Sequence, residues 1–374
     1  MQKILIFLIV AGSLLACSEN SKNLKIRENT DIEAFSSISS LQALQNALED
    51  DPDNVDILYK IALWHYYKKE YSKAESFLQK AIIIEPNWKL YLLEAQSKYK
   101  NKQLVQARKS WQEAYRLEPQ ALPILLFGLQ SAIDSKDSIL ANKLITKTKS
   151  IYPNDPQLYY WQGKWATTQN DTTQAFSYFE KALSFNSNLA EAYLHISELY
   201  NHYEKPEKAI LWAKKGLKIK PKYDSLLLET AIGYQFLKET DSAQKYYLSA
   251  YQLNNTLYKA SYELGIQAWK AGKYQESLTL FENTYHYKKD LPKINYYIGS
   301  CHESLDKKNL AVDFYKKAVQ QEPDNLTSRQ ALASLQQRLE LLRLQRIQDS
   351  LFRVQKEAEM KLLEEQQKQN TSQP

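Results

Sequence analysis

Residues 153–187 read PNDPQLYYWQGKWATTQNDTTQAFSYFEKALSFNS, and this stretch decides the fold. It places three small residues, Gly163, Ala175 and Ala182, at spacings of twelve and seven, with the bulky Phe179 between the last two. Spacings of four and then three put Ala175, Phe179 and Ala182 on one face of a helix. The stretch therefore predicts two helices whose small residues let their backbones approach closely.

The same pattern recurs along the chain at a nearly constant period. Prolines mark it at steps of 33 or 34 residues, or multiples of 34: Pro52, Pro86, Pro119, Pro153, Pro221 and Pro323. A column of small residues keeps this register: Ala62, Ala95, Gly128, Gly163, Ser197, Ala231, Gly265 and Gly299. A fixed period of this length indicates stacked repeats, each of which buries its apolar face against its neighbours.

The repeated pattern resembles the tetratricopeptide repeat, with small residues in both helices, an aromatic between them and a terminal proline. Ile298-Gly299 followed by Ala311, Tyr315, Ala318 and Pro323 is a second clear copy. The resemblance implies an all-α, right-handed superhelical solenoid over residues 37–323. It would hold about eight helix-turn-helix units across 53–323, behind a leading helix near 38–50. The alternative is an irregular helical bundle.

Composition agrees with an all-helical chain. Only 8 Gly and 11 Pro occur in 374 residues, and no segment alternates apolar and polar residues at the period of a strand. Because Lys and Arg (49) are interleaved with Asp and Glu (43), the chain lacks the basic stripe that a nucleic-acid partner requires. We therefore expect no nucleic-acid binding.

The first residues predict export and a lipid anchor. Lys3 precedes a short apolar run that ends in Leu14-Leu15-Ala16-Cys17, too short to span a bilayer but typical of a signal peptide. The ending resembles a bacterial lipobox, which implies removal of residues 1–16 and acylation of Cys17. The alternative is an ordinary cleaved signal with a chance cysteine.

Residues 17–36 would form the acylated cysteine and a flexible tether, because the part after Cys17, residues 18–36, is polar and lacks periodicity. By the resemblance to lipoproteins, Ser18 after the cysteine favours the outer membrane. The expected location is therefore the bacterial cell envelope, lipid-anchored and facing the periplasm.

Motifs of catalysis do not occur in the sequence. It has no Gly-rich phosphate loop, H-E-x-x-H, G-x-S-x-G or C-x-x-C, and its five histidines are scattered. His195 and Glu198 could share a helical face, but a metal requires more ligands. We expect a protein that is not an enzyme and that uses no metal or cofactor.

The resemblance implies that the first helix of each pair lines a concave face. Counted from the start of that helix, positions two, five, nine and twelve would point into a peptide-binding groove, and the candidates come from the last three of these positions. The candidate residues are Tyr59, Leu63, Tyr66, Leu92, Tyr99, Tyr160, Lys164, Leu228, Tyr262, Ile266, Trp269 and Tyr296. No position-five residue is Lys, which disfavours the carboxylate clamp known in some relatives. The alternative is that these tyrosines only fill contacts between helices.

Residues 324–368 predict a long C-terminal helix, followed by a disordered tail at 369–374. An apolar stripe at Leu332, Leu335, Leu339 and Leu342 would cap the last repeat. A second stripe follows in shifted phase: Leu344, Ile347, Leu351, Val354 and Ala358. This second stripe suits a short coiled coil, a partner site or a partly solvated helix.

Together these features predict a non-catalytic, membrane-tethered scaffold. It would bind a polypeptide segment of an envelope assembly, secretion or motility machine through the groove. The alternative is a glycan- or peptidoglycan-binding lipoprotein that stacks groove aromatics on sugars. Position five and position nine supply mostly Leu, Ile and Tyr, which favours a peptide.

Overall fold

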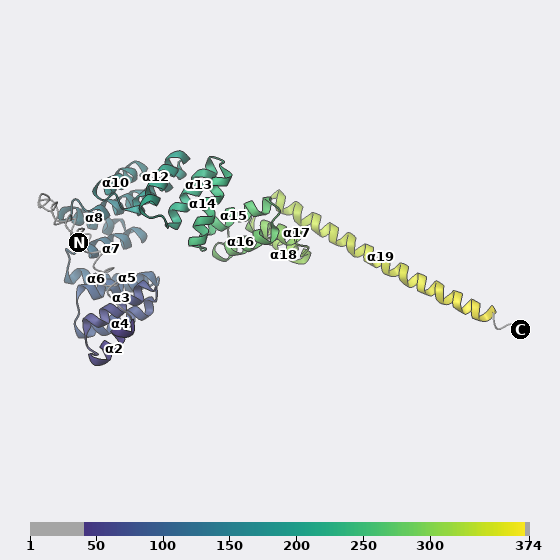
Figure 1. Cartoon of the computed structure of the whole chain (residues 1–374), viewed down its shortest axis with the longest axis horizontal. Helices are drawn as coiled ribbons and strands as arrows, with labels where there is room; N and C mark the ends of the chain where they lie inside the picture. Colours follow the sequence, from purple (N-terminus) through teal and green to yellow (C-terminus); the bar gives the residue numbers. More distant parts are fainter. Residues whose placement is uncertain (1–40, 371–374) are drawn as a thin grey trace, which may run out of the picture. The chain divides into compact units, whose positions relative to one another are not determined.

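The computed structural model describes residues 41–370, and side chains as far as residue 361. The predicted signal peptide, Cys17 and tether, together with residues 371–374, lie outside the described residues. Between Leu41 and Asn370 the chain forms helices only, joined by short turns (Figure 1). The predicted all-α fold of consecutive helix-turn-helix repeats is confirmed.

The described helices form eight pairs behind a leading helix, α2 (Leu41–Asp50), and divide between two compact units, Met1–Ser187 and Asn188–Pro374. Unit 1 contains α3 (Val55–Tyr67) with α4 (Tyr71–Ile84), α5 (Trp88–Lys100) with α6 (Leu104–Leu117), α7 (Leu122–Asp134) with α8 (Ser138–Ile151), and α9 (Pro156–Thr168) with α10 (Thr172–Phe185). Unit 2 contains α11 (Ala190–His202) with α12 (Pro206–Ile219), α13 (Asp224–Phe236) with α14 (Thr240–Leu253), α15 (Tyr258–Lys270) with α16 (Tyr274–Tyr287), and α17 (Ile294–Ser304) with α18 (Lys308–Gln321). We call the first helix of each pair its A helix and the second its B helix.

The small-residue columns lie where the two helices of a pair meet. Gly163 on α9 faces Phe179 on α10, and a Cβ added to this glycine would lie 2.6 Å from the ring. Gly265 meets Phe281 in the same way. In the first pair, Ala62 occupies the small position and the less bulky Leu78 faces it from α4 within one core cluster. In these pairs, a small residue on the A helix leaves room for the side chain that packs on it from the B helix.

Every turn between an A helix and its B helix contains one residue with positive φ. These residues are Lys69, Lys102, Lys136, Asn170, Glu204, Lys238, Gly272 and Asp306. The amide of the next residue donates to a carbonyl five residues back, as Glu70 does to His65 at 2.9 Å. This closes the A helix in the manner of a Schellman motif, so each turn reverses the chain without a long loop.

The third pair departs from the others, because its first helix has Pro123 near its start. The proline stands in the first turn of α7, where its missing amide hydrogen is not needed. Most of α7 is apolar and buried, and Trp111 of α6 packs against Gly128 while its indole nitrogen donates to the Ile124 carbonyl at 2.9 Å. The resulting cluster joins α5, α6, α7 and α8 in one core region of unit 1.

The last helix, α19 (Leu326–Asn370), has 45 residues and continues past α17 and α18 (Figure 1). Its first turns pack on the last pair through Leu335, which is 1% exposed, with Leu332 and Leu339 beside it. Arg338 forms an ion pair with Glu303 on α17. Leu342, the fourth residue of the predicted capping stripe, is 39% exposed and lies outside this cluster.

Candidate partner-binding surface

The predicted groove residues all lie on A helices, but the structure divides them by burial. Leu63, Leu92 and Leu228 are 2%, 6% and 8% exposed and belong to the cores of their units. The other nine candidates, on α3, α5, α9, α15 and α17, are partly exposed. Accessible contact area at the predicted positions is therefore aromatic, with Ile266 and Lys164 as the exceptions.

In unit 1 the aromatic candidates are held by neighbouring rings. Tyr66 lies edge-on to Tyr71 at 5.6 Å, and burial raises its pKa to about 12. Tyr160 lies 5.1 Å from Trp161 and contacts Phe179 of α10. Each ring has one side against its repeat and is fixed in orientation, as a preformed binding surface requires.

Tyr99 on α5 makes a bond to the next repeat. Its hydroxyl donates to the carboxylate of Asp134 at the end of α7, and its ring lies edge-on to Phe127. Burial, followed by the bond to this carboxylate, raises the pKa of Tyr99. The side chain thus joins two A helices of unit 1 as well as presenting part of its ring.

In unit 2, four of the predicted groove residues lie around Tyr297, a residue that the sequence analysis did not propose. Tyr297 of α17 stacks on Phe281 at 5.0 Å and receives the edges of Tyr262 at 6.1 Å and Trp269 at 5.4 Å. Tyr296 lies beside it, and Ile266 packs against the same core cluster. We call Tyr262, Ile266, Trp269, Tyr296 and Tyr297 the unit 2 aromatic cluster.

Two polar atoms of this cluster are occupied within the chain. The Trp269 indole nitrogen donates to the Ser300 hydroxyl at 2.9 Å, and the Tyr262 hydroxyl donates to the Pro292 carbonyl at 3.3 Å. Burial raises the pKa of Tyr262 to about 12. The donors of Trp269 and Tyr262 are therefore directed into the chain, and these two side chains offer ring faces and edges to a partner.

Position twelve of the A helices has a structural role that the sequence analysis missed. Besides Tyr99 and Trp269, Asn201 of α11 donates to the Glu229 carboxylate on α13 at 2.8 Å, and Gln235 of α13 donates to Glu263 on α15 at 2.8 Å. In each case the bond joins one A helix to the next. These bonds fix the spacing of the A helices on which the candidate surface depends.

Glu229 is the most perturbed carboxyl group of unit 2. It is 8% exposed, and loss of solvent raises its pKa from 4.5 to about 7, against the opposing hydrogen bond from Asn201. The nearby charge of Glu198 raises the pKa further, and that of Lys259 lowers it. Burial also raises the pKa of Glu263. A protonated Glu229 fits the apolar environment better than an ionised one.

The remaining reactive groups give no sign of a catalytic or metal centre in the described residues. No group of three or more His, Cys, Asp and Glu side chains there could hold a metal ion. Cys301 is fully buried beside Ser277, and burial raises its thiol pKa. His195 and Glu198 form a pair at 2.5 Å. No described helix has the length and apolar character that a membrane crossing demands.

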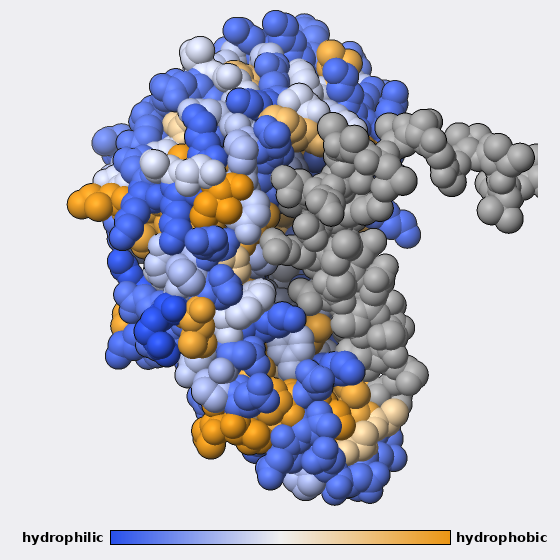
Figure 2. All heavy atoms as spheres, turned by 90° about the vertical axis from the view of Figure 1, so that its left-hand side faces the viewer, coloured by the Kyte–Doolittle hydropathy of each residue, from blue (hydrophilic) through white to orange (hydrophobic). Residues whose placement is uncertain are grey.

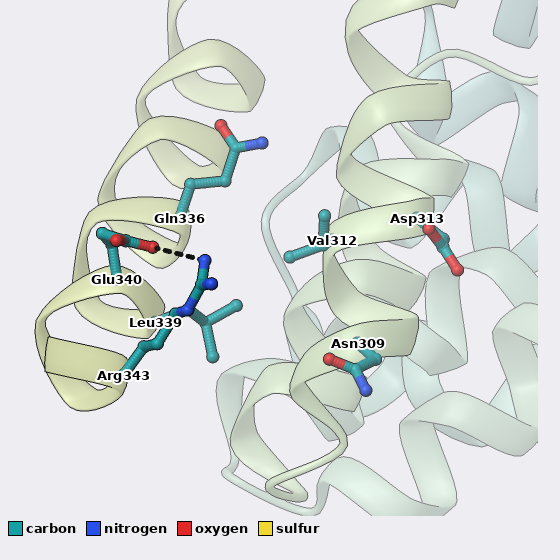
Figure 3. A pocket seen from close by; sticks show the side chains of 7 residues that line it. All are labelled: Asn309, Val312, Asp313, Gln336, Leu339, Glu340 and Arg343. Carbon is teal, nitrogen blue, oxygen red and sulfur yellow. Dashed lines mark ion pairs between the residues drawn. The ribbon is translucent and has the colours of Figure 1, made fainter. Parts of the chain in front are cut away.

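A hollow of about 520 Å³ lies between α18 and the start of α19 (Figure 3). Its lining is mixed, with Val312 and Leu339 beside polar side chains that include Asp313. Glu340 and Arg343, which form an ion pair at 3.9 Å, close its α19 side. The polar lining and open shape are those of a surface groove rather than an enclosed ligand pocket.

On the B helices, exposed apolar side chains are dispersed. Figure 2 shows apolar patches separated by hydrophilic surface on one face of the molecule. Ile83 on α4 and Ile139 on α8, each 83% exposed, stand on B helices of different repeats. Single exposed residues of this kind are normal on soluble proteins and indicate no site.

Two family models described as "Tetratricopeptide repeat" match the chain, at residues 156–189 and 262–325. A curated relative, the probable biofilm formation methyltransferase WspC of Pseudomonas putida, is 33% identical over 75 residues. That match covers 20% of this chain and 18% of the relative. The chain thus spans less than a fifth of this curated relative.

Solved structures share the fold. Yeast Tom70 superposes with a TM-score of 0.57 at 15% identity, covering 83% of this chain and 68% of Tom70. The Cut9–Hcn1 hetero-tetramer of the APC/C superposes with a TM-score of 0.56 at 14% identity, covering 83% of this chain and 59% of that chain. The pilF protein of Pseudomonas aeruginosa superposes with a TM-score of 0.52 at 12% identity, covering 56% of this chain and 96% of pilF.

Such low identities show a common fold and no more. Together with the two family matches and the eight helix pairs, they identify the repeat. The chain therefore contains tetratricopeptide repeats, a protein–protein interaction scaffold whose fold is generally non-catalytic.

Proposed function

We propose that this chain is a non-catalytic scaffold of the bacterial envelope, which binds a polypeptide segment through the partly exposed aromatic residues of its A helices. The unit 2 aromatic cluster carries the proposal. Its rings are already fixed by stacking and by the Trp269–Ser300 and Tyr262–Pro292 hydrogen bonds. Large rings held in place lose little freedom on binding, so most of their contact energy contributes to affinity.

The polar atoms of these side chains favour a peptide over a sugar. A glycan site needs several free hydrogen-bonding groups beside its stacking rings, whereas Tyr99, Trp269 and Tyr262 direct theirs to Asp134, Ser300 and Pro292. Apolar ring faces suit the side chains of an extended or helical segment. A segment of an envelope assembly, secretion or motility machine is the partner that agrees with the predicted export signal.

The membrane tether is supported by the sequence alone. Leu14-Leu15-Ala16-Cys17 follows an apolar run with the layout of an export signal. Acylation at Cys17 with more than one chain would hold the protein durably, because a single chain gives only marginal binding. Ser18 favours the outer membrane, with the repeats facing the periplasm.

Site-specific photo-crosslinking in the native envelope tests the binding surface. A photoreactive phenylalanine derivative would replace Tyr160 or Tyr296 on A helices, which keeps an aromatic ring at each position. The matched controls place it at Ile83 or Ile139, which are more exposed but lie on B helices. We expect the A-helix positions to crosslink the same protein and the controls not to do so.

Three results would contradict the proposal. One is capture of that protein from the B-helix positions alone, which would move the surface. Another is an absence of protein crosslinks together with retention of the purified chain on a peptidoglycan column, which would favour the glycan alternative. The last is loss of a measurable enzymatic activity on substitution of an A-helix residue.

A further inference from the structure

The distal part of α19 carries an apolar stripe that nothing in the described part of the chain covers. Leu344, Ile347, Leu351 and Val354 recur at spacings of three, four and three. Their exposed fractions are 53%, 48%, 59% and 61%, although large aliphatic residues are usually buried. A repeat of 3.5 residues is the pattern of a coiled-coil seam.

This stripe does not continue the surface that α19 uses to cap the repeats. At about 100° per residue, the stripe points roughly 120° away from the direction of Leu335 and Leu339. Leu335 is buried against α18, so the second stripe faces away from that packing. The same helix therefore has two apolar faces, of which the last repeat can cover only the first.

The charges beside the stripe match a second copy of the helix running in the opposite direction. An antiparallel pairing of Leu344 with Val354 of the other copy, and of Ile347 with Leu351, gives four consecutive apolar layers. Other antiparallel registers give fewer apolar layers or place Lys361 in the seam. In this register, the positions beside the seam place Arg343 of each copy opposite Glu357 of the other, which gives two ion pairs related by the twofold axis. Ser350 of each copy lies near that axis.

A parallel pairing lacks this complementarity. Its flanking contacts would join Arg343 to Gln348 and Ser350 to Gln355, which forms no ion pair between the copies. In the single chain Arg343 makes only a long, exposed ion pair with Glu340, at 3.9 Å (Figure 3). Such an exposed pair contributes little stability, so Arg343 can give it up for Glu357 of another copy at little cost.

We propose that two copies of this chain associate through an antiparallel coiled coil formed by residues 343–357 of α19. Each pair would carry two sets of repeats and two predicted lipid anchors. A partner with two binding segments, or a membrane surface, would then be held at both ends, and avidity would exceed the affinity of one copy. This inference does not depend on what the A helices bind.

Sedimentation equilibrium of the chain without its predicted signal peptide (residues 1–16) and with Cys17→Ser, over a wide range of concentrations, tests the association. We expect a reversible monomer–dimer equilibrium. Leu351→Glu places a charge in two central layers and should abolish the dimer, whereas Phe352→Glu, one residue away and outside the seam, should leave it intact. Both side chains are exposed, at 59% and 65%, so far-UV circular dichroism should show an unchanged repeat domain.

Charge reversal tests the orientation. Arg343→Glu or Glu357→Arg alone should raise the dimer dissociation constant about tenfold, because each makes two like-charged pairs. The double variant Arg343→Glu/Glu357→Arg should restore it. A chain that is monomeric at all concentrations would overturn the proposal, as would a dimer that survives Leu351→Glu. Single reversals without effect would show that the helices do not pair antiparallel.

Discussion

Seven of the eight turns within the helix pairs place a side-chain-bearing residue in the left-handed region of the backbone, and only Gly272 lacks a Cβ. Left-handed backbone at a non-glycine residue costs about 1 kcal/mol. The turns tolerate this because the Schellman-type bond of the next amide fixes the reversal. The strain is therefore repeated along the chain, and it can be relieved one turn at a time.

Lys136→Gly should stabilise the protein. Lys136 has φ of 57° and is exposed in the turn between α7 and α8, so glycine removes the steric strain without losing packing. We expect the free energy of unfolding in urea to rise by about 0.5–1 kcal/mol. Lys109→Gly, at an exposed position inside α6, is the matched control and should lower it by about 1 kcal/mol. A loss of stability at position 136 would contradict the strain argument.

The pairing of small and bulky residues gives a second prediction. Gly163→Ala alone puts a methyl group 2.6 Å from the Phe179 ring, so overpacking should cost about 1–3 kcal/mol. Phe179→Leu alone should leave a cavity at a fully buried site. The double variant reproduces the Ala62 and Leu78 pair of the first repeat and should recover part of both losses. A double-mutant cycle measured by denaturant unfolding gives the coupling; additive losses would show that the two residues do not share a site.

Glu229 makes stability depend on pH. Its folded pKa of about 7 exceeds the ordinary 4.5, so between these values the folded carboxyl keeps a proton that the unfolded chain has released. The contribution of Glu229 is therefore complete below pH 4.5 and is lost as pH rises through 7. Glu229→Gln, which stays neutral, should equal the parent near pH 4.5 and exceed it at pH 8 by on the order of 2 kcal/mol. Equal melting temperatures of parent and variant at pH 8 would show that Glu229 ionises without penalty.

At the scale of the element, α19 combines a docked and an undocked segment. Leu335 is 1% exposed, whereas Leu341 is 58% exposed on the same helix. Terminal repeats of a solenoid need a cover for the face that has no further neighbour, and the first turns of α19 supply it for α18. Stability should therefore depend on the first part of the helix and not on the second.

Leu335→Ala should lower the free energy of unfolding by about 2–4 kcal/mol, because it leaves a cavity against Ala311 and Tyr315. Leu341→Ala, the control, should change it by less than about 0.5 kcal/mol. Chemical unfolding at low protein concentration, followed by tryptophan fluorescence, separates the two. Equal effects would mean that the two leucines contribute alike to the folded chain.

The helices could be predicted from the sequence because each depends on residues at fixed spacing. Gly163, Phe179 and Ala182 define a pair of helices without knowledge of any neighbour. The bonds of position twelve are harder to predict, because no single residue type marks that position. Asn201 and Gln235 donate an amide to a glutamate of the next A helix, whereas Trp269 donates an indole to Ser300. The positive-φ turns had a signal that was missed: Lys recurs there at Lys69 and Lys102, one period apart.

The groove residues lie on A helices as expected, but their role in binding stays a prediction, and their burial could not be read from the sequence. Position five holds the partly exposed ring of Tyr160 in one repeat and the buried Leu228 in another, and burial depends on contacts between helices that the sequence does not give. Tyr297 was missed for the same reason. It is one residue beyond position five, yet stacking on Phe281 brings it to the centre of the aromatic cluster.

At the scale of the whole molecule, the proposed anchor and the proposed binding surface are separable. The anchor depends on Cys17, far along the chain from the A helices, and the surface depends on rings fixed within each unit. In a chain whose residues 1–16 are replaced by an ordinary cleavable signal peptide, Cys17→Ser should therefore move the protein from the membrane fraction to the soluble fraction and abolish incorporation of labelled fatty acid. A soluble chain that keeps both an export signal and the repeats should still crosslink its partner from Tyr160 or Tyr296 when the envelope is opened.

Two outcomes would contradict this separation. Loss of those crosslinks with the repeats intact would mean that the membrane, and not the aromatic surface alone, creates the binding site. Retention in the membrane fraction would mean that another segment holds the protein there.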